Sequence, residues 1–464
     1  MSNLQINRRA KKSGLGKFIF ILMVLGGILG YIYTANFFER EVPVISMKNI
    51  EYWSKKQPIS IILSDNYELK NYQVTIDDGK NKFILMQENL EDSNLQTKNI
   101  ALTYPSKRIS KKAKVVEVTI SLQDKSLWNF LLGNRTTKTF DLKIDHKRPT
   151  LQIISSSNSM KRGGSGLVIV KALDEALDSV YIDVGDKIFK MQPYRKDGYF
   201  VSLVAWSFHK ENFSAKVVAL DKAGNKRQIK VPFFLKDKKY KTSWIKASDK
   251  FIDGKISDLA SNDENYEHIT DRLEKLKVIN ENMRIANEKL IHELSEKIST
   301  DRIDSWKIKK FYPLKSAAVV ATFGDERHYY YKDKDNEVSQ SYHVGLDLAS
   351  TKMASIKTSN PGKVVFASYN GIYGNMPMID HGLGLYTIYG HCSSLLIEVG
   401  DEVNAGDVIS QTGQTGLALG DHLHFGILVQ GIEVRIAEWM DTKWIKIHID
   451  DVFKEANRII DVTK

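Results

Sequence analysis

One uncharged, apolar stretch near the N-terminus is long enough to cross a lipid bilayer. It covers Phe18–Phe38, 21 residues without Asp, Glu, Lys or Arg, and about 20 apolar residues span the hydrocarbon core as a helix. We therefore predict a transmembrane helix at 18–38. This helix requires the chain to fold on two sides of a membrane.

The charges on each side of this stretch predict its orientation. A cytoplasmic basic tail at 1–17 precedes it, and its basic residues are Arg8, Arg9, Lys11, Lys12 and Lys17. Because positive residues stay on the cytoplasmic side, everything after residue 40 is expected on the periplasmic side. A cleaved signal peptide is the alternative, but the apolar run is long for one and no small-x-small cleavage site follows it.

Composition limits the chemistry of the remaining chain. With 464 residues, two to four domains are expected. Cys392 is the only cysteine, so no intrachain disulfide can form and metal ligands must be nitrogen or oxygen atoms. The formal charge of +11 favours anionic neighbours such as lipid headgroups and cell-wall polymers. The basic residues form no compact stripe, which argues against nucleic acid as a partner.

Residues 42–236 have the pattern of short β-strands separated by polar turns, as in Val115–Ile120. We predict two β-sandwich domains, at 42–147 and 148–240. The second carries the turn Asp221–Asn225, which resembles the hairpins of bacterial immunoglobulin-like modules. A spacer and a wall-binding module are both compatible with these domains.

A charged segment at 250–310 is predicted to be a helical linker. Apolar residues recur in it mostly at intervals of three and four: Ile269, Leu273, Leu276, Ile279, Met283, Ala286, Leu290 and Leu294. The stripe fits packing on the last domain, a linker or a dimer seam. A weaker hypothesis is that this helix, or the Tyr-rich loop at 328–342, covers the active site and keeps it latent, with Asn280, Asn282 or Asn287 reaching a metal. His292–Glu296 lacks the second histidine of an HExxH zinc motif, so we exclude it.

A glycine-rich β domain is predicted at 311–440, followed by a helical tail at 441–464 that caps it. Five of the eleven histidines lie between 343 and 424. His422 and His424 are two apart on a predicted strand and so share one face. His343 and Asp347 can reach the same metal if the chain bends at Gly345. Two imidazoles and one carboxylate are a common ligand set for catalytic zinc.

The patterns HxxxD, YGH and HxH occur in this order, and they resemble the LytM/lysostaphin family of zinc endopeptidases. The resemblance covers about residues 313–436. The resemblance implies an antiparallel β peptidase fold and one Zn²⁺ per chain. It also implies that His343, Asp347 and His424 bind the metal. His391 and His422 would then be the catalytic pair, with their individual roles left open.

Four neighbouring residues have simpler interpretations. Asp421, where the family often has a small or hydroxylated residue, is either a partner of a metal ligand or a turn residue, and we favour the turn. His381 is interpreted as structural, and Cys392 as a small buried residue. His328 is either in an exposed aromatic loop or at the edge of the substrate groove.

These features together predict a membrane-anchored zinc metalloendopeptidase that hydrolyses peptide cross-links of bacterial peptidoglycan. The main alternative is an inactive LytM-like regulator of a separate cell-wall amidase. A scaffold that contacts cell-wall or division-complex proteins is a third possibility. The family resemblance favours a D-Ala–diaminopimelate linkage over a pentaglycine bridge, and the second stays open. The balance of endopeptidase and carboxypeptidase activity and the oligomeric state stay open.

Overall fold

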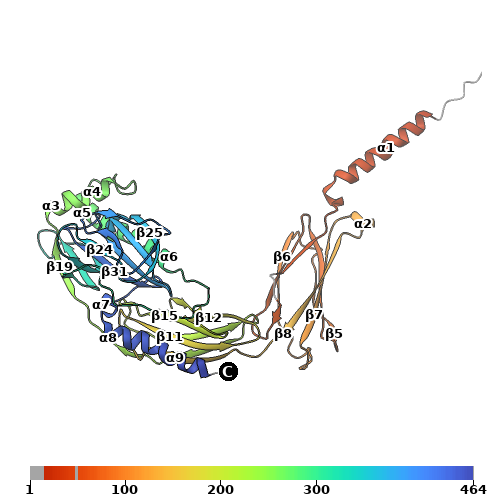
Figure 1. The fold of residues 1–464 in the computed structure, drawn as a ribbon. Helices are drawn as coiled ribbons and strands as arrows, with labels where there is room; N and C mark the ends of the chain where they lie inside the picture. Colours follow the sequence, from red (N-terminus) through yellow and green to blue (C-terminus); the bar gives the residue numbers. More distant parts are fainter. Residues whose placement is uncertain (1–14, 48–50, 463–464) are drawn as a thin grey trace, which may run out of the picture. The chain divides into compact units, whose positions relative to one another are not determined.

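The computed structural model describes residues 15–47 and 51–462. The basic residues predicted to orient the first helix, apart from Lys17, lie outside the described residues. The chain divides into two compact units, residues 1–148 with 221–225 and residues 149–220 with 226–464. Each unit consists largely of β-strands (Figure 1), which confirms the predicted mostly β fold class.

The first unit begins with helix α1 (Leu15–Thr34), whose mean hydropathy is 2.1 and whose residues are all outside the core. Its 20 residues extend about 30 Å, the thickness of a bilayer core. The helix is three residues longer at its start than predicted and four residues shorter at its end. Asn36–Phe38 instead form a single 3₁₀ turn, η1.

The β part of the first unit consists of two sheets around one core. The three-stranded sheet has the order β1 (Val44–Met47), β3 (Ile59–Ser64), β6 (Thr97–Leu102). The five-stranded sheet has the order β2 (Tyr52–Trp53), β8 (Arg135–Ile144), β7 (Val115–Asp124), β4 (Leu69–Asp77), β5 (Lys82–Asn89). Strand β7 alternates exposed and buried side chains, which follows from the period of two along a strand. An immunoglobulin-like topology for this domain stays a prediction.

The second unit starts with two four-stranded sheets. Their orders are β14 (Gln192–Pro193), β15 (Tyr199–Ala205), β11 (Ser165–Leu173), β9 (Thr150–Ser156), and β13 (Ile188–Lys190), β12 (Leu177–Asp183), β16 (Lys216–Asp221), β17 (Lys226–Lys230). A short parallel pair joins β10 (Ser159–Lys161) to β18 (Phe234–Lys236). The immunoglobulin-like assignment of this region also stays a prediction.

An eight-stranded antiparallel sheet dominates the C-terminal half. Its order is β20 (Ala318–Ala321), β23 (Leu346–Ala349), β31 (Leu423–Val429), β27 (Leu385–Gly390), β26 (Asn375–Asp380), β25 (Gly362–Tyr369), β29 (Glu402–Val403), with β32 (Ile432–Glu433) also paired to β31. Two three-stranded sheets flank it: β19 (Thr242–Lys246), β21 (Asp325–Tyr330), β22 (Glu337–His343), and β24 (Ser355–Lys357), β30 (Val408–Gln411), β28 (Ser394–Leu395). Short η4 (Gly371–Tyr373) precedes β26.

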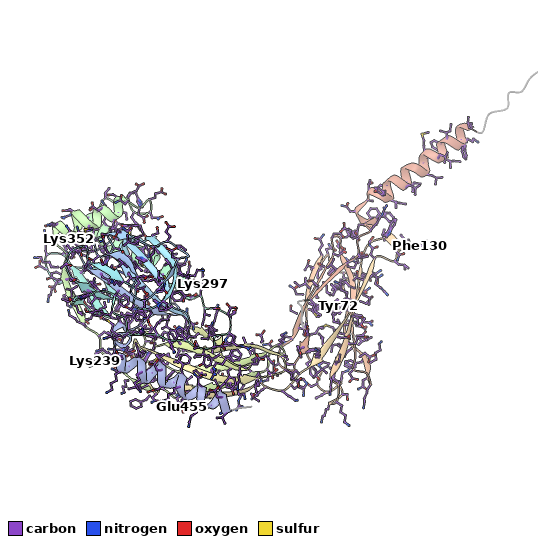
Figure 2. The ribbon with its side chains drawn as sticks, in the orientation of Figure 1. Tyr72, Phe130, Lys239, Lys297, Lys352 and Glu455 are labelled. Carbon is purple, nitrogen blue, oxygen red and sulfur yellow. The ribbon has the colours of Figure 1, made fainter. Side chains whose placement is uncertain are left out.

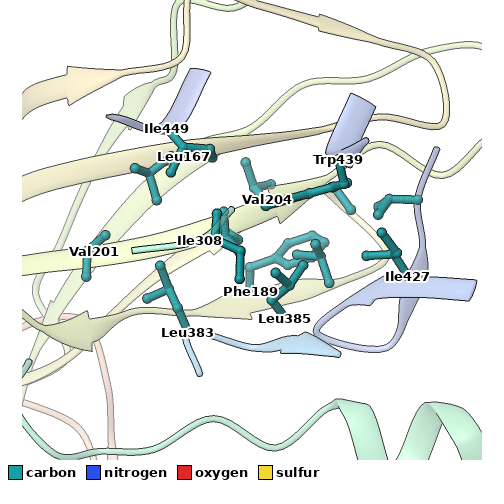
Figure 3. Close-up of a cluster of buried hydrophobic side chains, with 14 of the residues drawn as sticks. Leu167, Phe189, Val201, Val204, Ile308, Leu383, Leu385, Ile427, Trp439 and Ile449 are labelled. Carbon is teal, nitrogen blue, oxygen red and sulfur yellow. The ribbon is translucent and has the colours of Figure 1, made fainter. Parts of the chain in front are cut away.

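One hydrophobic core joins residues 150–231 to the C-terminal sheet. Figure 3 shows Leu167, Val201 and Val204 packed together with Leu385, Ile427 and Trp439. Buried hydrogen bonds cross the same contact, from Trp439 Nε1 to Ser165 Oγ at 3.1 Å and from Gln430 Nε2 to Ser202 Oγ at 3.0 Å. The predicted domains at 148–240 and 311–440 therefore stabilise each other directly.

The predicted linker helix is interrupted. Its pieces are α3 (Asp249–Phe251), η2 (Ile252–Ile256), α4 (Ser257–Ser261), α5 (Arg272–Val278), η3 (Ile279–Met283) and α6 (Arg284–Ser295). Segment η3 is a π-helical turn, which inserts an extra residue and rotates the buried face. Ala286 and Leu290, predicted in the apolar stripe, are consequently exposed, while Ile291 is buried. The buried face packs on the C-terminal sheet through Ile372, Tyr373 and Met376.

The C-terminal tail forms α7 (Ile436–Trp439), α8 (Thr442–Ile445), η5 (Lys446–Asp450) and α9 (Asp451–Val462). Helix α9 buries Val452, Phe453, Ala456 and Ile460 and contacts β9 and β11. The prediction that this tail caps the last β domain was therefore wrong for α9. The helix covers the sheet of the preceding β region because its apolar face complements that sheet.

Candidate metal and hydrolase site

Three neighbouring strands bring the predicted metal ligands together. Asp347 on β23 is paired directly with His424 on β31 in the antiparallel register. His343 is the last residue of β22, and the chain turns at Val344–Gly345 before β23 begins. Residues that are 77 positions apart in the sequence thus face each other across one hydrogen-bonded pair of strands.

The three side chains form a compact group that could hold a metal ion. His343 Nε2 lies 2.9 Å from Asp347 Oδ1 and 3.1 Å from His424 Nδ1, and the latter two atoms are 2.9 Å apart. Ligands about 2.0–2.1 Å from a tetrahedral zinc ion are about 3.3 Å from each other. The observed separations are close to that value.

The protonation of this group favours a cation at its centre. His343 Nδ1 lies 3.0 Å from the carbonyl oxygen of Thr322, and a carbonyl can only accept, so Nδ1 donates. In the neutral ring, Nε2 then presents a lone pair to the Asp347 carboxylate. A positive ion between these two atoms removes the repulsion between them.

Burial and the neighbouring side chains together set the pKa values of Asp347 and His424, the other two candidate ligands. Burial raises the pKa of Asp347, but the adjacent imidazoles of His343 and His424 outweigh burial and hold the pKa well below its usual range. Burial lowers the pKa of His424 to about 4 despite the opposing charge of Asp347. Zinc requires deprotonated ligands, so both shifts suit metal binding.

His391 and His422 form a second pair beside the first three residues, with ring centroids 4.8 Å apart. His391 Nδ1 donates to the carbonyl oxygen of Thr415 at 2.9 Å, and His422 Nδ1 donates to that of Gly420 at 2.8 Å. These bonds leave Nε2 of each neutral ring as the proton acceptor. His422 Nε2 is 3.8 Å from Asp347 Oδ2.

The environment of His391 keeps its ring neutral. Burial lowers its pKa well below the usual value, and nearby His424 and His422 lower it further. The residue has a φ of +65°, a left-handed conformation that is uncommon for a residue with a side chain. Its backbone N–H donates to the carbonyl oxygen of Tyr373 at 2.7 Å. Such unusual backbone conformations concentrate at functional sites.

All five residues line one cavity of about 700 Å³. Much of its remaining wall comes from segments with no metal-ligand pattern. Strand β19, which pairs in parallel with β21, supplies Lys246, and Lys241 lies just before that strand. The start of α6 supplies Arg284. Tyr373 also lines it, with its ring centroid 5.4 Å from that of His424. Sequence reasoning missed these residues because only tertiary packing places them here.

The histidines and the cysteine that were set aside have structural partners. His381 is buried and bonded to Pro361 O and Thr387 Oγ1, each at 2.8 Å. His328 stacks on Trp244 with centroids 4.6 Å apart and is not among the cavity residues. Cys392 is buried, and burial raises the pKa of its thiol to about 12. A thiol with this pKa is a poor nucleophile.

Asp421 and the linker asparagines also have defined roles. Asp421 accepts hydrogen bonds from Thr412 Oγ1 at 2.6 Å and from the Met353 backbone at 3.1 Å, so it fixes a turn. Asn280 donates to Ser339 Oγ, and Asn287 accepts from the backbone of Ile372. Asn280, Asn282 and Asn287 are not among the cavity residues, whereas Phe251 and Arg284 of the linker are. The hypothesis that the linker covers the metal therefore stays a prediction.

Comparison with known proteins places the same region in a peptidase family. Residues 341–436 match the model of peptidase family M23. The DD-carboxypeptidase/endopeptidase Mpg of Neisseria meningitidis is 36% identical over 89 residues, 19% of this chain and 20% of that protein. The peptidoglycan DD-endopeptidase ShyA of Vibrio cholerae is also 36% identical over 89 residues, 19% of this chain and 21% of that protein.

The chain thus spans about a fifth of the length of these curated relatives. Among solved structures, the catalytic domain of lysostaphin from Staphylococcus simulans is 24% identical. The structural match covers 27% of this chain and 92% of the lysostaphin domain, with a TM-score of 0.23. On the strength of the family model and of the relatives in sequence, residues 341–436 of this chain are a domain of peptidase family M23.

Proposed function

We propose that this protein is a membrane-anchored zinc endopeptidase that hydrolyses peptide cross-links of bacterial peptidoglycan. The observation that carries the proposal is the convergence of five predicted residues in one cavity: His343, Asp347, His391, His422 and His424. The M23 match and the relatives named as peptidoglycan DD-endopeptidases support the substrate class.

In this proposal, His343, Asp347 and His424 hold one zinc ion. The ligand atoms of the three residues converge, and the three residues line the cavity, so they face the space from which a catalytic zinc site takes its water ligand. Bound zinc supplies Lewis acidity for the scissile carbonyl and a source of hydroxide at neutral pH. The remaining steps depend on the side chains of this chain.

His391 and His422 handle the proton. Each ring donates through Nδ1 to a backbone carbonyl, which fixes its orientation and leaves Nε2 to accept a proton from water. The low pKa of His391 keeps it neutral and ready to act as a base. Once protonated, either ring can stabilise the developing oxyanion or return the proton to the leaving amine. Because both rings present Nε2 in the same way, either His391 or His422 can be the base that takes the proton from water.

The charges of the cavity favour an acidic peptide as substrate. Its charged lining residues are Lys241, Lys246, Arg284, Arg327, Asp325 and Asp347, so cations outnumber carboxylates. Stem peptides with diaminopimelate carry free carboxylates, whereas a pentaglycine bridge has no charged side chain. The lining therefore supports a D-Ala–diaminopimelate cross-link over a pentaglycine bridge.

Membrane anchoring by α1 completes the proposal. The helix is long and apolar enough to cross a bilayer, and the basic residues before it predict a cytoplasmic N-terminus. The catalytic domain then lies on the periplasmic side, where peptidoglycan is found. We further propose that the β domain at 42–147 acts as a spacer, so that the tethered site reaches only nearby wall.

The main alternative is an inactive regulator of a separate amidase. Regulators of this type typically lack some of the metal ligands and catalytic histidines, whereas this chain has all five of these residues in the cavity. This completeness favours the enzyme.

The test uses the full chain, purified in detergent and loaded with zinc. We expect about one zinc ion per chain and release of peptide fragments from purified sacculi, identified by mass spectrometry. His391→Ala should abolish release but retain zinc, because His391 is not among the three converging ligands. The matched control is His268→Ala, at an exposed position outside the cavity. A zinc-loaded parent protein that releases no fragments would contradict the enzymatic proposal.

A further inference from the structure

The connection between β7 and β8 exposes four large apolar side chains within six residues. The exposed fraction is 94% for Phe130, 65% for Leu131, 62% for Leu132 and 39% for Leu127. Figure 2 shows Phe130 projecting from the β part of the first unit. Single exposed apolar residues are ordinary, but a contiguous group marks a contact surface. We call residues 127–132 the apolar loop.

The base of the apolar loop is firmly held. The buried carboxylate of Asp124 accepts hydrogen bonds from the backbone of Ser126 at 3.0 Å and from that of Asn134 at 2.7 Å. It also accepts from the side-chain amide of Asn134 at 2.8 Å. The side chains at the tip are therefore presented to solvent by an ordered base, and their exposure is not the consequence of a frayed end.

The backbone at the tip is itself unusual. Asn129, Phe130 and Leu131 have φ values of 54°, 59° and 68°. Consecutive non-glycine residues in the left-handed region are unfavourable, and such conformations persist where surrounding contacts compensate for them. A contact that covers the exposed tip would provide that compensation.

The apolar loop lies beside the end of the candidate membrane helix. The backbone N–H of Leu127 donates to the carbonyl oxygen of Phe37 at 2.6 Å, three residues after α1 ends. The hydroxyl of Ser126 donates to the carbonyl oxygen of Glu39 at 2.7 Å. The tip and the helix end therefore occupy the same level of the molecule, and a membrane that contains α1 reaches the tip.

The side chains around this contact are those of a membrane–water interface. The guanidinium of Arg40 lies 4.4 Å from the ring centroid of Tyr33 and 4.4 Å from that of Trp128. Tyr and Trp are enriched at the headgroup level of membranes. Arg keeps its charge at that level while its stem lies along apolar surface.

We propose that the apolar loop inserts into the outer leaflet of the membrane that holds α1. This inference rests on the proposed anchoring by α1. The hydrogen bond from Leu127 to Phe37 keeps the exposed loop beside the end of an exposed apolar helix, which argues for lipid over a protein partner. Insertion gives the β domain a second attachment point and restricts its rotation on the membrane. The direction in which the spacer leaves the membrane is thereby fixed.

The test places a single fluorescent label in the full chain. Cys392 is fully buried and does not compete for labelling. Phe130→Cys carries an environment-sensitive fluorophore in nanodiscs of phosphatidylethanolamine and phosphatidylglycerol, with or without lipids that bear a nitroxide near the headgroup. The matched control is Lys80→Cys, in the exposed turn between β4 and β5. The β4–β7 register places this turn at the opposite end of the sheet, eight residues or about 27 Å along β4.

We expect the nitroxide lipids to quench the label at position 130 several-fold more than the label at position 80. Water-soluble iodide should give the opposite order. Equal behaviour of the two labels, in chains that resist extraction by alkaline carbonate, overturns the inference while leaving the anchor intact. That outcome also fits a loop that binds a protein partner. Chains that carbonate extracts would overturn the anchor and the inference together.

Discussion

Gly345→Ala tests the metal site without removing a ligand. A Cβ atom at position 345 would lie 2.4 Å from both Cε1 and Nε2 of His424. An ordinary contact needs about 3.5 Å, so the imidazole has to move by about 1 Å. The ring is buried and packs edge-on against His343 and Tyr373, which leaves little space for the movement.

The displacement matters because zinc ligation tolerates errors of only about 0.2 Å in ligand distance. Disturbing the residues that orient a ligand costs about 10–100-fold in metal affinity, or about 1.4–2.7 kcal/mol. We therefore expect Gly345→Ala to weaken zinc binding by at least that factor and to reduce peptide release in parallel. Competition with a zinc-chelating dye measures the affinity in the full chain.

The matched control is Gly420→Ala. A Cβ atom there has no neighbour within 4 Å, and neither glycine has a left-handed backbone. The two substitutions are compared by zinc affinity, because the carbonyl oxygen of Gly420 accepts from His422 and not from a candidate metal ligand. Circular dichroism of both variants checks that the chain is folded. If folded Gly345→Ala binds zinc as tightly as Gly420→Ala, the placement of His424 against Gly345 is wrong.

Two further predictions concern the surroundings of the site. Truncation to residues 300–464 should abolish activity, because it removes Ile279, Met283 and Ile291 from the core under the catalytic sheet; an active fragment in the sacculus assay would contradict this. His381 should make the fold acid-sensitive, because burial lowers its pKa from 6.5 to about 4. Since the unfolded chain takes up this proton first, stability is unaffected above pH 6.5 and falls by about 3 kcal/mol as the pH drops to 4. His381→Gln should reduce that loss in urea unfolding, and an unchanged pH dependence would refute it.

Local patterns were sufficient for several features. The uncharged stretch at 18–38 predicted a long apolar helix, and alternation in segments such as 115–120 predicted strands. Local spacing also predicted two pairs of candidate site residues, His422 with His424 and His343 with Asp347. A spacing of two on a strand places side chains on one face whatever the rest of the chain does, so sequence alone shows it. The pair His343 and Asp347 also needs the turn at Val344–Gly345 between β22 and β23.

The linker helix shows where local patterns fail. The predicted stripe assumed a continuous α-helix, but the π-helical turn at 279–283 shifts the buried face, so that Ile291 and not Leu290 enters the core. The buried face packs on Ile372, Tyr373 and Met376, which lie far from the helix in the sequence. Helix periodicity alone contains no record of this surface.

The sequence by itself determined the apolar helix, the β-rich class and the identity of the five candidate site residues. Only the tertiary structure decided that Asp347 pairs with His424, that Arg284 joins the same cavity, and that the apolar loop lies beside Phe37. The physical reason is the range of the interactions. Residues close in sequence are constrained by backbone geometry, whereas strand register and packing between distant segments depend on burial across the whole unit.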